Sequence, residues 1–273
     1  MQRYAEEAVR EFMGGELQPM FYKHWKGQKN APFSNVTADE IDHILETSMK
    51  RSDRYRILKN AGMPMDSIKA EFDRPVPMTI FSWDGPIDTV MSPMDSIRYY
   101  KWFLQASLIS IESHTGHVKA YVGGLDYRFF KYDHVTQARR QVGSTFKPFL
   151  YSLAMQEGEY TPCTKIPNIQ YNIQLEDGKV WSPGNSGGRV GEEITLKYAL
   201  AQSNNWISAY LMNQFGPNAV IAQARRMGVE SPIDAVPAIC LGVCDLKLIE
   251  MVGAMSTFAN QGVYIKPMFI TRI

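Results

Sequence analysis

The residues best suited to covalent chemistry are Ser144 and Lys147, which stand three positions apart in the segment RRQVGSTFKPF. If this segment opens a helix, both side chains lie on one face and the lysine can reach the serine hydroxyl. A serine becomes a strong nucleophile when a neighbour accepts its proton, and a partly desolvated lysine with a lowered pKa can accept it. The spacing predicts a nucleophile beside its base, although Ser-x-x-Lys alone is a weak signal.

The residues around this pair favour that interpretation. Gly143 permits a sharp turn before the helix, which leaves the amide of Ser144 and the helix N-terminus available to stabilise an oxyanion. Pro148 removes a backbone hydrogen bond to the carbonyl of Ser144, so we expect a distorted first turn rather than a plain helix.

A second candidate element is the run Ser203-Asn204-Asn205, on a short connection between two predicted helices. A hydroxyl two residues before an amide can place a proton shuttle and a substrate-orienting group in one cleft. Ordinary helix capping by Ser203 or Asn204 explains the same residue types, and on these residues alone it is the better explanation.

Composition excludes several classes of protein. The chain has 273 residues, 45% of them apolar and 21% charged, which is typical of a globular protein. A net charge of +1 without a basic block argues against nucleic-acid binding, and no apolar run is long enough to span a membrane. The three cysteines, of which we expect Cys240 and Cys244 to pack in the core, lack histidines at metal-ligand spacing, so we expect no metal and no cofactor.

The elements that must position the site divide into an early helical part and a later mixed part. We expect a short helix that ends at Gly14-Gly15, and a second that begins at the capping box of Thr37 and Glu40. Further predictions are hairpins around 84–86, 115–116 and 172–181, a helix capped by Ser92, and helical stretches near 196–200, 207–211, 220–224 and 248–255. Strands followed by helices predict an α+β fold, with an antiparallel sheet flanked by helices.

Several longer segments of the sequence resemble a known protein family. The segments are VKAYVGG at 118–124, VTQARRQVGSTFKPF at 135–149, EITLKYALAQSNNWISAYL at 193–211 and LGVCDLKLIEMVGAMSTFANQGVYIKP at 241–267. Together they resemble the transpeptidase domain of class A, bifunctional penicillin-binding proteins, whose motif set includes Ser-x-x-Lys. The resemblance covers most of residues 79–273 and implies the penicillin-binding, serine β-lactamase-like fold. We expect residues 1–91 to be a linker or pedestal and residues 92–273 to be the major part of the transpeptidase domain.

The resemblance also implies roles for individual residues. Ser144 corresponds to the nucleophile acylated by D-Ala-D-Ala stem peptides or β-lactams, and Lys147 to its general base. Ser203 corresponds to the proton relay, Asn205 to the group that binds the substrate's peptide amide, and Asn204 to the variable middle position. The implied activity is peptidoglycan D,D-transpeptidation, in which an amine acceptor takes the acyl group and cross-links the cell wall.

One part of the family pattern is missing. No Lys-Thr-Gly triplet follows Ser203, so we expect a truncated polypeptide with poor or absent activity. His114-Thr115-Gly116 precedes the nucleophile and is interpreted as a turn. The parent implied by the resemblance also carries a glycosyltransferase domain and a membrane anchor, faces the periplasm, and meets the lipid-linked precursor. We expect the present chain to be soluble and to approach the membrane only through those other parts.

Two alternatives stay open. A serine β-lactamase or D,D-carboxypeptidase shares the acylation machinery, but we find no dedicated deacylating glutamate between Ser144 and Ser203. The glutamates there are interpreted as surface charges; they are Glu157, Glu159, Glu176, Glu192 and Glu193. The alternative from another class is a non-catalytic cell-wall binding module, in which the serines and the lysine only cap and solvate helices.

Overall fold

The computed structural model describes residues 1–175, 178–185 and 188–272 of the chain. It divides into two compact units, and each is described by itself. Unit 1 comprises Met1–Leu108 and Val122–Lys131, and unit 2 comprises Ile109–Tyr121 and the chain from Tyr132 onward. The predicted boundary between residues 91 and 92 stays a prediction.

Unit 1 is mostly helical. Its elements are α1 (Gln2–Phe12), a π-helical turn η1 (Met13–Leu17), α2 (Gln18–Trp25), α3 (Ala38–Lys50), α4 (Asp53–Asn60), α5 (Met65–Asp73), β1 (Val76–Ile80), β2 (Ile87–Met91) and α6 (Pro93–Tyr100). Two predicted helix starts are confirmed. Thr37 and Glu40 form a reciprocal capping box at α3, and Ser92 accepts a hydrogen bond from the amide of Asp95 at α6.

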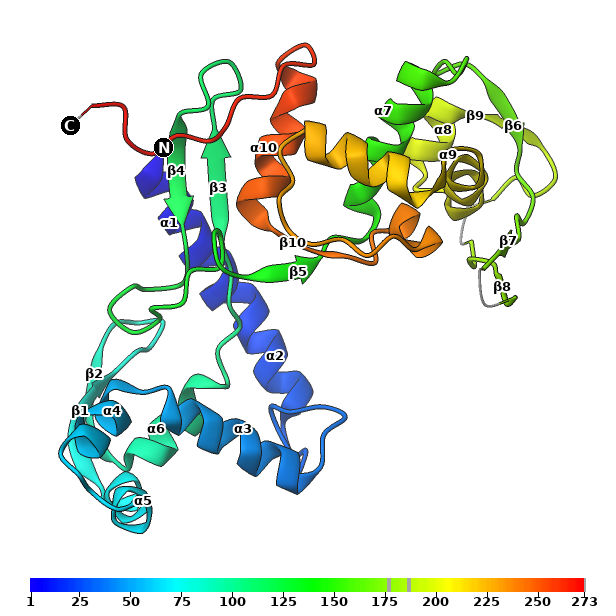
Figure 1. Cartoon of the computed structure of the whole chain (residues 1–273). Coiled ribbons are helices and arrows are strands. Elements are labelled where there is room, and N and C mark those ends of the chain that lie inside the picture. The colour runs from blue at the N-terminus through cyan, green and yellow to red at the C-terminus, as the bar shows by residue number, and fades with distance from the viewer. Residues whose placement is uncertain (176–177, 186–187, 273) are drawn as a thin grey trace. The chain divides into compact units, whose positions relative to one another are not determined.

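The predicted helix end at Gly14-Gly15 is wrong. The chain stays helical through η1 into α2 (Figure 1), and neither glycine adopts a positive φ. Gly14 instead allows a close approach, because a Cβ at this position would lie 2.7 Å from Cε3 of Trp83. Gly14 lets its helix pack closely against Trp83, a residue far away in the sequence. A rule that reads glycine as a local helix stop cannot detect such a contact.

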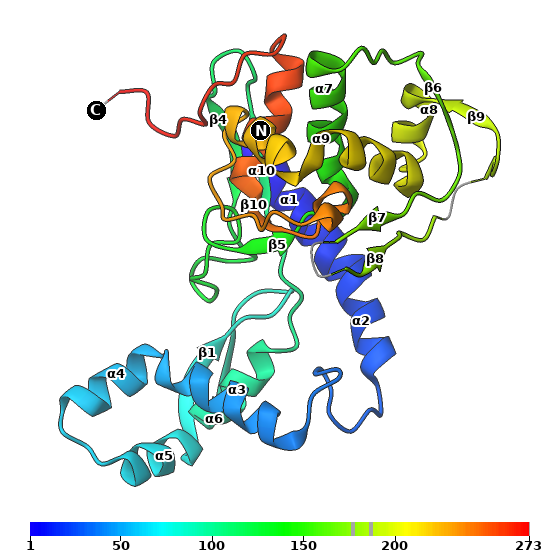
Figure 2. The same ribbon diagram turned by 45° about the vertical axis from the view of Figure 1, so that its right-hand side comes forward.

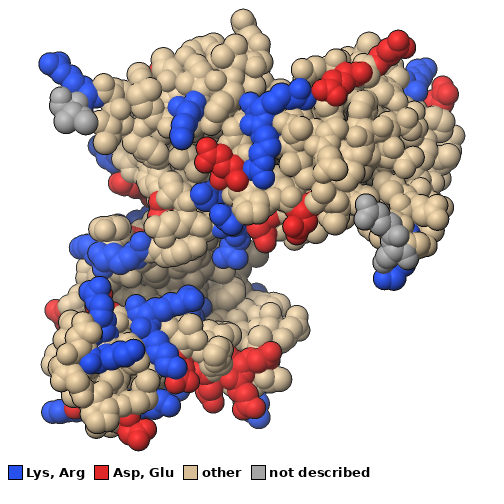
Figure 3. Space-filling model, in the orientation of Figure 1, with Lys and Arg blue, Asp and Glu red and all other residues tan. Residues whose placement is uncertain are grey.

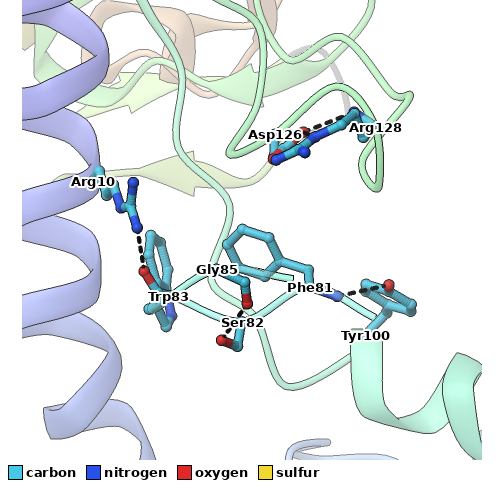
Figure 4. Close-up of polar contacts among 8 residues, drawn as sticks. All are labelled: Arg10, Phe81, Ser82, Trp83, Gly85, Tyr100, Asp126 and Arg128. Carbon is cyan, nitrogen blue, oxygen red and sulfur yellow. Dashed lines mark hydrogen bonds and ion pairs between the residues drawn. The ribbon is translucent and has the colours of Figure 1, made fainter. Parts of the chain in front are cut away.

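The predicted hairpin around 84–86 is confirmed. Strands β1 and β2 pair antiparallel, from Val76 opposite Met91 to Ile80 opposite Ile87. Figure 4 shows how the turn is held: Ser82 donates to the carbonyl of Gly85 at 2.6 Å, and Arg10 of α1 donates to the carbonyl of Trp83 at 2.9 Å. The hydroxyl of Tyr100 accepts from the amide of Phe81, which ties the hairpin to α6 within unit 1.

Unit 2 combines short strands with helices. Its elements are β3 (Leu108–Ile111) and β4 (Val118–Val122), each with one terminal residue in unit 1, then β5 (Arg139–Gln141), η2 (Gly143–Phe146), α7 (Lys147–Glu157), β6 (Lys165–Pro167), β7 (Ile173–Gln174), β8 (Val180–Trp181), β9 (Glu193–Thr195), α8 (Leu196–Ala201), α9 (Asn205–Arg226), η3 (Pro237–Leu241), β10 (Asp245–Lys247) and α10 (Leu248–Ala259).

The strands of unit 2 join in pairs, β3 with β4, β5 with β10, β6 with β9 and β7 with β8. The last three pairs are antiparallel. Thr115-Gly116 lies in the β3–β4 turn, as expected, with Gly116 at φ +73°. The hairpin predicted at 172–181 is also confirmed by the β7–β8 pair, although residues 176–177 lie outside the described residues.

The core of unit 2 lies among its helices. Buried side chains of α7, α8 and α9 meet those of η3, β10 and α10 in one hydrophobic cluster, which includes Phe149, Leu196, Ile207, Cys240 and Leu246. Both views show α7, α8 and α9 together, with β6 and β9 beside them (Figures 1 and 2). Helices packed with antiparallel strand pairs confirm the α+β prediction, and Cys240 and Cys244 are buried and free, as expected.

Two further features are the distribution of charge on the surface and the apolar length of the helices. Basic and acidic side chains are interspersed on the face drawn in Figure 3, with wide uncharged areas between them, in keeping with the net charge of +1. Among the residues described, no helix combines the length and apolar character needed to cross a membrane.

Candidate active site

Ser144 lies in a tight turn that leads directly into a helix. Gly143 has φ +56°, and residues Gly143–Phe146 form the 3₁₀ turn η2. The carbonyl of Ser144 accepts from the amide of Lys147, so the bond that Pro148 cannot make is replaced by a tighter one. The predicted distortion of the first turn is therefore present. The side chain of Ser144 is exposed at this turn.

A second backbone segment fixes the turn from the opposite side. Strand β5 pairs with β10, and the ladder continues where Val142 donates to the carbonyl of Cys244 and Gly143 to that of Gly242, both at 3.1 Å. Gly242 has φ +74°, and a Cβ there would lie 1.8 Å from the carbonyl oxygen of Gly143. Only glycine fits this position, so Gly242 sets how closely the two segments approach beside Ser144.

We therefore expect Gly242→Ala to destabilise the protein strongly. The positive φ costs about 1–2 kcal/mol for a non-glycine residue, and the clash adds about 1–3 kcal/mol more. Gly262→Ala is the matched control, because Gly262 has φ +90° but open space around its Cβ position. Urea unfolding measures both variants. Equal losses of unfolding free energy would show that the contact with Gly143 has no special weight.

Lys147 is fully buried at the start of α7 and faces the turn before α9. Its Nζ donates to the carbonyl of Ser203 at 2.6 Å, to Oγ of Ser203 at 3.0 Å and to Oδ1 of Asn205 at 2.7 Å. These acceptors match the three N–H bonds of an ammonium. Burial lowers the pKa of Lys147 from 10.5 to about 8, so a neutral, proton-accepting form is accessible near physiological pH.

Cys240 is a buried titratable group that acts on Lys147. Its thiolate would raise the pKa of Lys147, which opposes the effect of burial. Burial, however, raises the pKa of the Cys240 thiol to about 12, so the thiol stays neutral when Lys147 titrates. Desolvation of the ammonium therefore dominates the electrostatics of this lysine.

Ser203 occupies a strained backbone position at the end of α8. The amide of Ser203 donates to the carbonyl of Leu200, and the amide of Asn204 to that of Ala199, which is a Schellman pattern. Glycine is usual at the left-handed residue of this motif, yet here it is Ser203, with φ +52°. The strained backbone turns both the carbonyl and the hydroxyl of Ser203 toward Lys147, and such strain often marks functional positions.

Asn204 and Asn205 divide two tasks between them. Oδ1 of Asn204 accepts from the amide of Ile207 at 3.0 Å, so Asn204 is the N-cap of α9. Asn205 binds Lys147 instead. Helix capping, the simpler explanation of these residue types, thus applies to Asn204, whereas Ser203 and Asn205 meet the lysine.

Three of the four predicted site residues are therefore in direct contact: Lys147, Ser203 and Asn205. Ser144 lies one turn before Lys147. In the described part of the chain, the hydrogen bonds of Lys147 go to Ser203 and Asn205 and not to Ser144. The role of each residue in catalysis stays a prediction.

Residues that the sequence analysis did not select also build this site. Gly242 fixes the turn that contains Ser144. Asn205 is held by two residues: its backbone amide donates to Oδ1 of Asn185 at 3.2 Å, and its Nδ2 donates to the carbonyl of Gly184 at 2.8 Å. Oδ1 of Asn168 accepts a hydrogen bond from Nδ2 of Asn204. None carries a local signal, because each acts on a residue at least 20 positions away.

The glutamates between Ser144 and Ser203 fit the surface interpretation where they are described. Glu157, Glu159, Glu192 and Glu193 are exposed, and Glu157 pairs with Arg226 at 3.0 Å. Glu176 lies outside the described residues.

Two protein-family models match the chain. Residues 28–104 match the penicillin-binding protein middle domain, and residues 106–236, which include Ser144, Lys147, Ser203 and Asn205, match the penicillin binding protein transpeptidase domain. The chain belongs to the penicillin-binding proteins. The resemblance identified from the sequence is thus confirmed.

Curated penicillin-binding proteins align over the same part of the chain. Penicillin-binding protein 2D of Bacillus subtilis is 37% identical over 172 residues, which is 62% of this chain and 25% of that protein. Penicillin-binding protein 1A of Neisseria flavescens is 36% identical over 173 residues, 62% of this chain and 22% of that protein. The matched part thus amounts to about a quarter of the length of these relatives.

Solved structures of penicillin-binding proteins share the fold. Penicillin-binding protein 1A from Haemophilus influenzae superposes with a TM-score of 0.56 and 32% identity, over 60% of this chain and 24% of that one. The penicillin-binding protein PonA1 from Mycobacterium tuberculosis gives a TM-score of 0.50 and 27% identity, over 60% of this chain and 46% of that one. These likenesses confirm the predicted fold class.

Proposed function

We propose that this chain carries the acylation centre of a peptidoglycan D,D-transpeptidase, with Ser144 as nucleophile and Lys147 as general base. The observation that carries the proposal is the buried Lys147, which has a pKa of about 8 and lies one turn after an exposed serine. At a pH near this pKa, both protonation states of the lysine are populated. The ammonium form donates hydrogen bonds to Ser203 and Asn205, and the neutral form can accept a proton.

In the proposed reaction, Oγ of Ser144 attacks the carbonyl carbon of the penultimate D-alanine while its proton passes to neutral Lys147. The C–N bond then breaks, and D-alanine leaves with a proton delivered through Ser203. An amine on a neighbouring stem peptide attacks the ester, which forms the new amide and restores the hydroxyl. The amide of Ser144 donates to no backbone carbonyl among the described residues, so it is available to the oxyanion.

The surroundings of this reaction are also part of the proposal. The substrates are peptidoglycan stem peptides, and β-lactams acylate the same serine. The longer protein faces the periplasm, is anchored in the membrane and carries a glycosyltransferase that uses the lipid-linked precursor. Residues 1–91 connect that part to the transpeptidase domain at residues 92–273. The relatives, which are bacterial penicillin-binding proteins, support this setting.

The test is to map and time the β-lactam adduct. We expect penicillin to add its own mass once per chain of the longer protein, and peptide mass spectrometry to locate the adduct on the peptide that contains Ser144. We expect the ester to persist for many minutes, because the four described glutamates between Ser144 and Ser203 are exposed rather than poised to activate water. The same assay on the 273-residue chain reports how much of the activity this part retains.

A chromogenic cephalosporin separates the rival activities. Fast, continuous turnover would support a serine β-lactamase, whereas stoichiometric acylation without turnover supports the transpeptidase. The absence of any adduct in the longer protein would instead support a non-catalytic module.

A further inference from the structure

Asn168 is a buried amide that makes a full set of contacts close to the candidate site. It follows β6, and its side chain is fully buried. Oδ1 accepts from Nδ2 of Asn204 at 2.8 Å, and Nδ2 donates to the carbonyls of Gly188 at 2.9 Å and Arg189 at 3.0 Å. Its backbone continues the ladder between β6 and β9, because its amide donates to Glu192 and its carbonyl accepts from Gly191. Asn168 is therefore fixed on both its backbone and its side chain.

The bond to Asn204 controls the residue between the two contacts of Lys147. Ser203 and Asn205 both meet the lysine, whereas Asn204 between them reaches Asn168 with its Nδ2 and caps α9 with its Oδ1. An amide that is bonded at both of its ends cannot rotate without the loss of two buried hydrogen bonds. The Asn168 contact thus locks the strained turn in the orientation that presents Ser203 to Lys147.

Nδ2 of the Asn168 side chain binds the backbone of a neighbouring loop at Gly188 and Arg189. The carbonyl that it binds at Arg189 belongs to a residue with φ +61°, a left-handed position that needs support. The other described part of this loop attaches to the same turn, because the carbonyl of Gly184 accepts from Asn205 and that of Pro183 accepts from Trp206. Asn168 therefore joins the loop and the turn into one hydrogen-bonded unit.

We propose that Asn168 is a positioning residue of the transpeptidase site, which holds Ser203 and Asn205 against Lys147 through Asn204 and holds the backbone at Gly188 and Arg189 through their carbonyls. This inference rests on the proposed function. It adds a residue that touches none of the reacting groups and acts only through its hydrogen bonds.

The test compares Asn168→Ala with Gln223→Ala. Gln223 is a matched control, since it is also a buried amide of unit 2, and it donates to Ser152 and Gln156 away from Lys147. We expect both variants to lose stability, Asn168→Ala more than Gln223→Ala, because Asn168 makes three side-chain hydrogen bonds and Gln223 makes two. Only Asn168→Ala should slow acylation by penicillin, by about 10–100-fold, because small displacements of catalytic groups have effects of this size.

The readout that separates positioning from stability is the titration of Lys147, followed by NMR of its side-chain carbon next to Nζ. When the turn loosens, water reaches the ammonium, and the pKa of Lys147 rises from about 8 toward its ordinary value of 10.5. We expect this rise in Asn168→Ala and not in Gln223→Ala. An unchanged titration together with equal acylation rates in the two variants would overturn the proposal.

Asn204→Ser tests the route of the effect. Serine keeps a capping oxygen for α9 but is too short to reach Asn168. We expect it to reproduce the effect of Asn168→Ala, and the double variant to be no slower than either single one, because the two residues share one interaction. Additive losses would overturn the route through Asn204. A rise of the Lys147 pKa in a protein that no penicillin labels would support the positioning role and overturn the proposed function.

Discussion

Ser144→Ala is expected to abolish covalent labelling by fluorescent penicillin, while the melting temperature stays within about 2 °C of that of the unsubstituted protein. The adduct is an ester of the serine Oγ, and alanine offers no atom on which it can form. The fold should tolerate the change, because the side chain of Ser144 is exposed and Lys147 keeps its contacts with Ser203 and Asn205. Gel fluorescence and circular dichroism measure the two properties on the same sample.

Thr145→Ala is the matched control for this variant. Thr145 is the neighbouring exposed hydroxyl, and it donates to the carbonyl of Val142 at 2.6 Å rather than toward the lysine. We expect it to label at a rate within a few-fold of the parent, since a single exposed hydrogen bond contributes about 1 kcal/mol. Labelling that persists in Ser144→Ala would place the nucleophile elsewhere, and Ser203 would be the next residue to test.

Elements whose signals are local were predicted well from the sequence. The capping box of Thr37 and Glu40 and the cap at Ser92 depend on residues three positions apart, and both form as expected. The helix end at Gly14-Gly15 was wrong because the decisive neighbour, Trp83, lies about 70 residues away in the chain. A glycine that permits close packing and a glycine that ends a helix look the same in sequence.

The candidate site shows the same division. The spacing predicts that Ser144 pairs with Lys147, and this pairing stays a prediction, because the hydrogen bonds of Lys147 among the described residues go to Ser203 and Asn205. For Ser203-Asn204-Asn205, the residue types alone gave helix capping as the better explanation. Only the folded chain separates their tasks, because the positive φ of Ser203 turns its carbonyl and hydroxyl to Lys147 while Asn204 caps α9. Asn168 was not predicted at all, since its partner Asn204 lies 36 positions away.

The second large effect is expected at Lys147. Lys147→Met keeps the length and the apolar stem of the side chain but removes the base, so acylation by penicillin should fall by about 10²–10⁴-fold. In the unsubstituted protein, only the neutral amine of Lys147 can accept the proton of Ser144. With a pKa of about 8, the neutral fraction is about 1/11 at pH 7 and about 10/11 at pH 9, so the acylation rate should rise about tenfold across this interval. Stopped-flow fluorescence at a series of pH values measures both effects.

The direction of this profile follows from the sign of the pKa shift. Burial favours the uncharged amine, so the site becomes competent as the pH rises through about 8. The folded state loses stability as the pH falls from about 10.5, where the unfolded chain takes up the proton, to about 8, and below that value the penalty of the buried charge is constant. Lys147→Met removes the titrating group, and its residual rate should therefore lack the rise between pH 7 and 9. Lys197→Met, which changes an exposed lysine of α8, should keep both the rate and the profile of the parent. A Lys147→Met protein that retained the rise would assign the base to another group, and a parent rate that fell with increasing pH would mean that the ammonium, rather than the amine, is the reactive form.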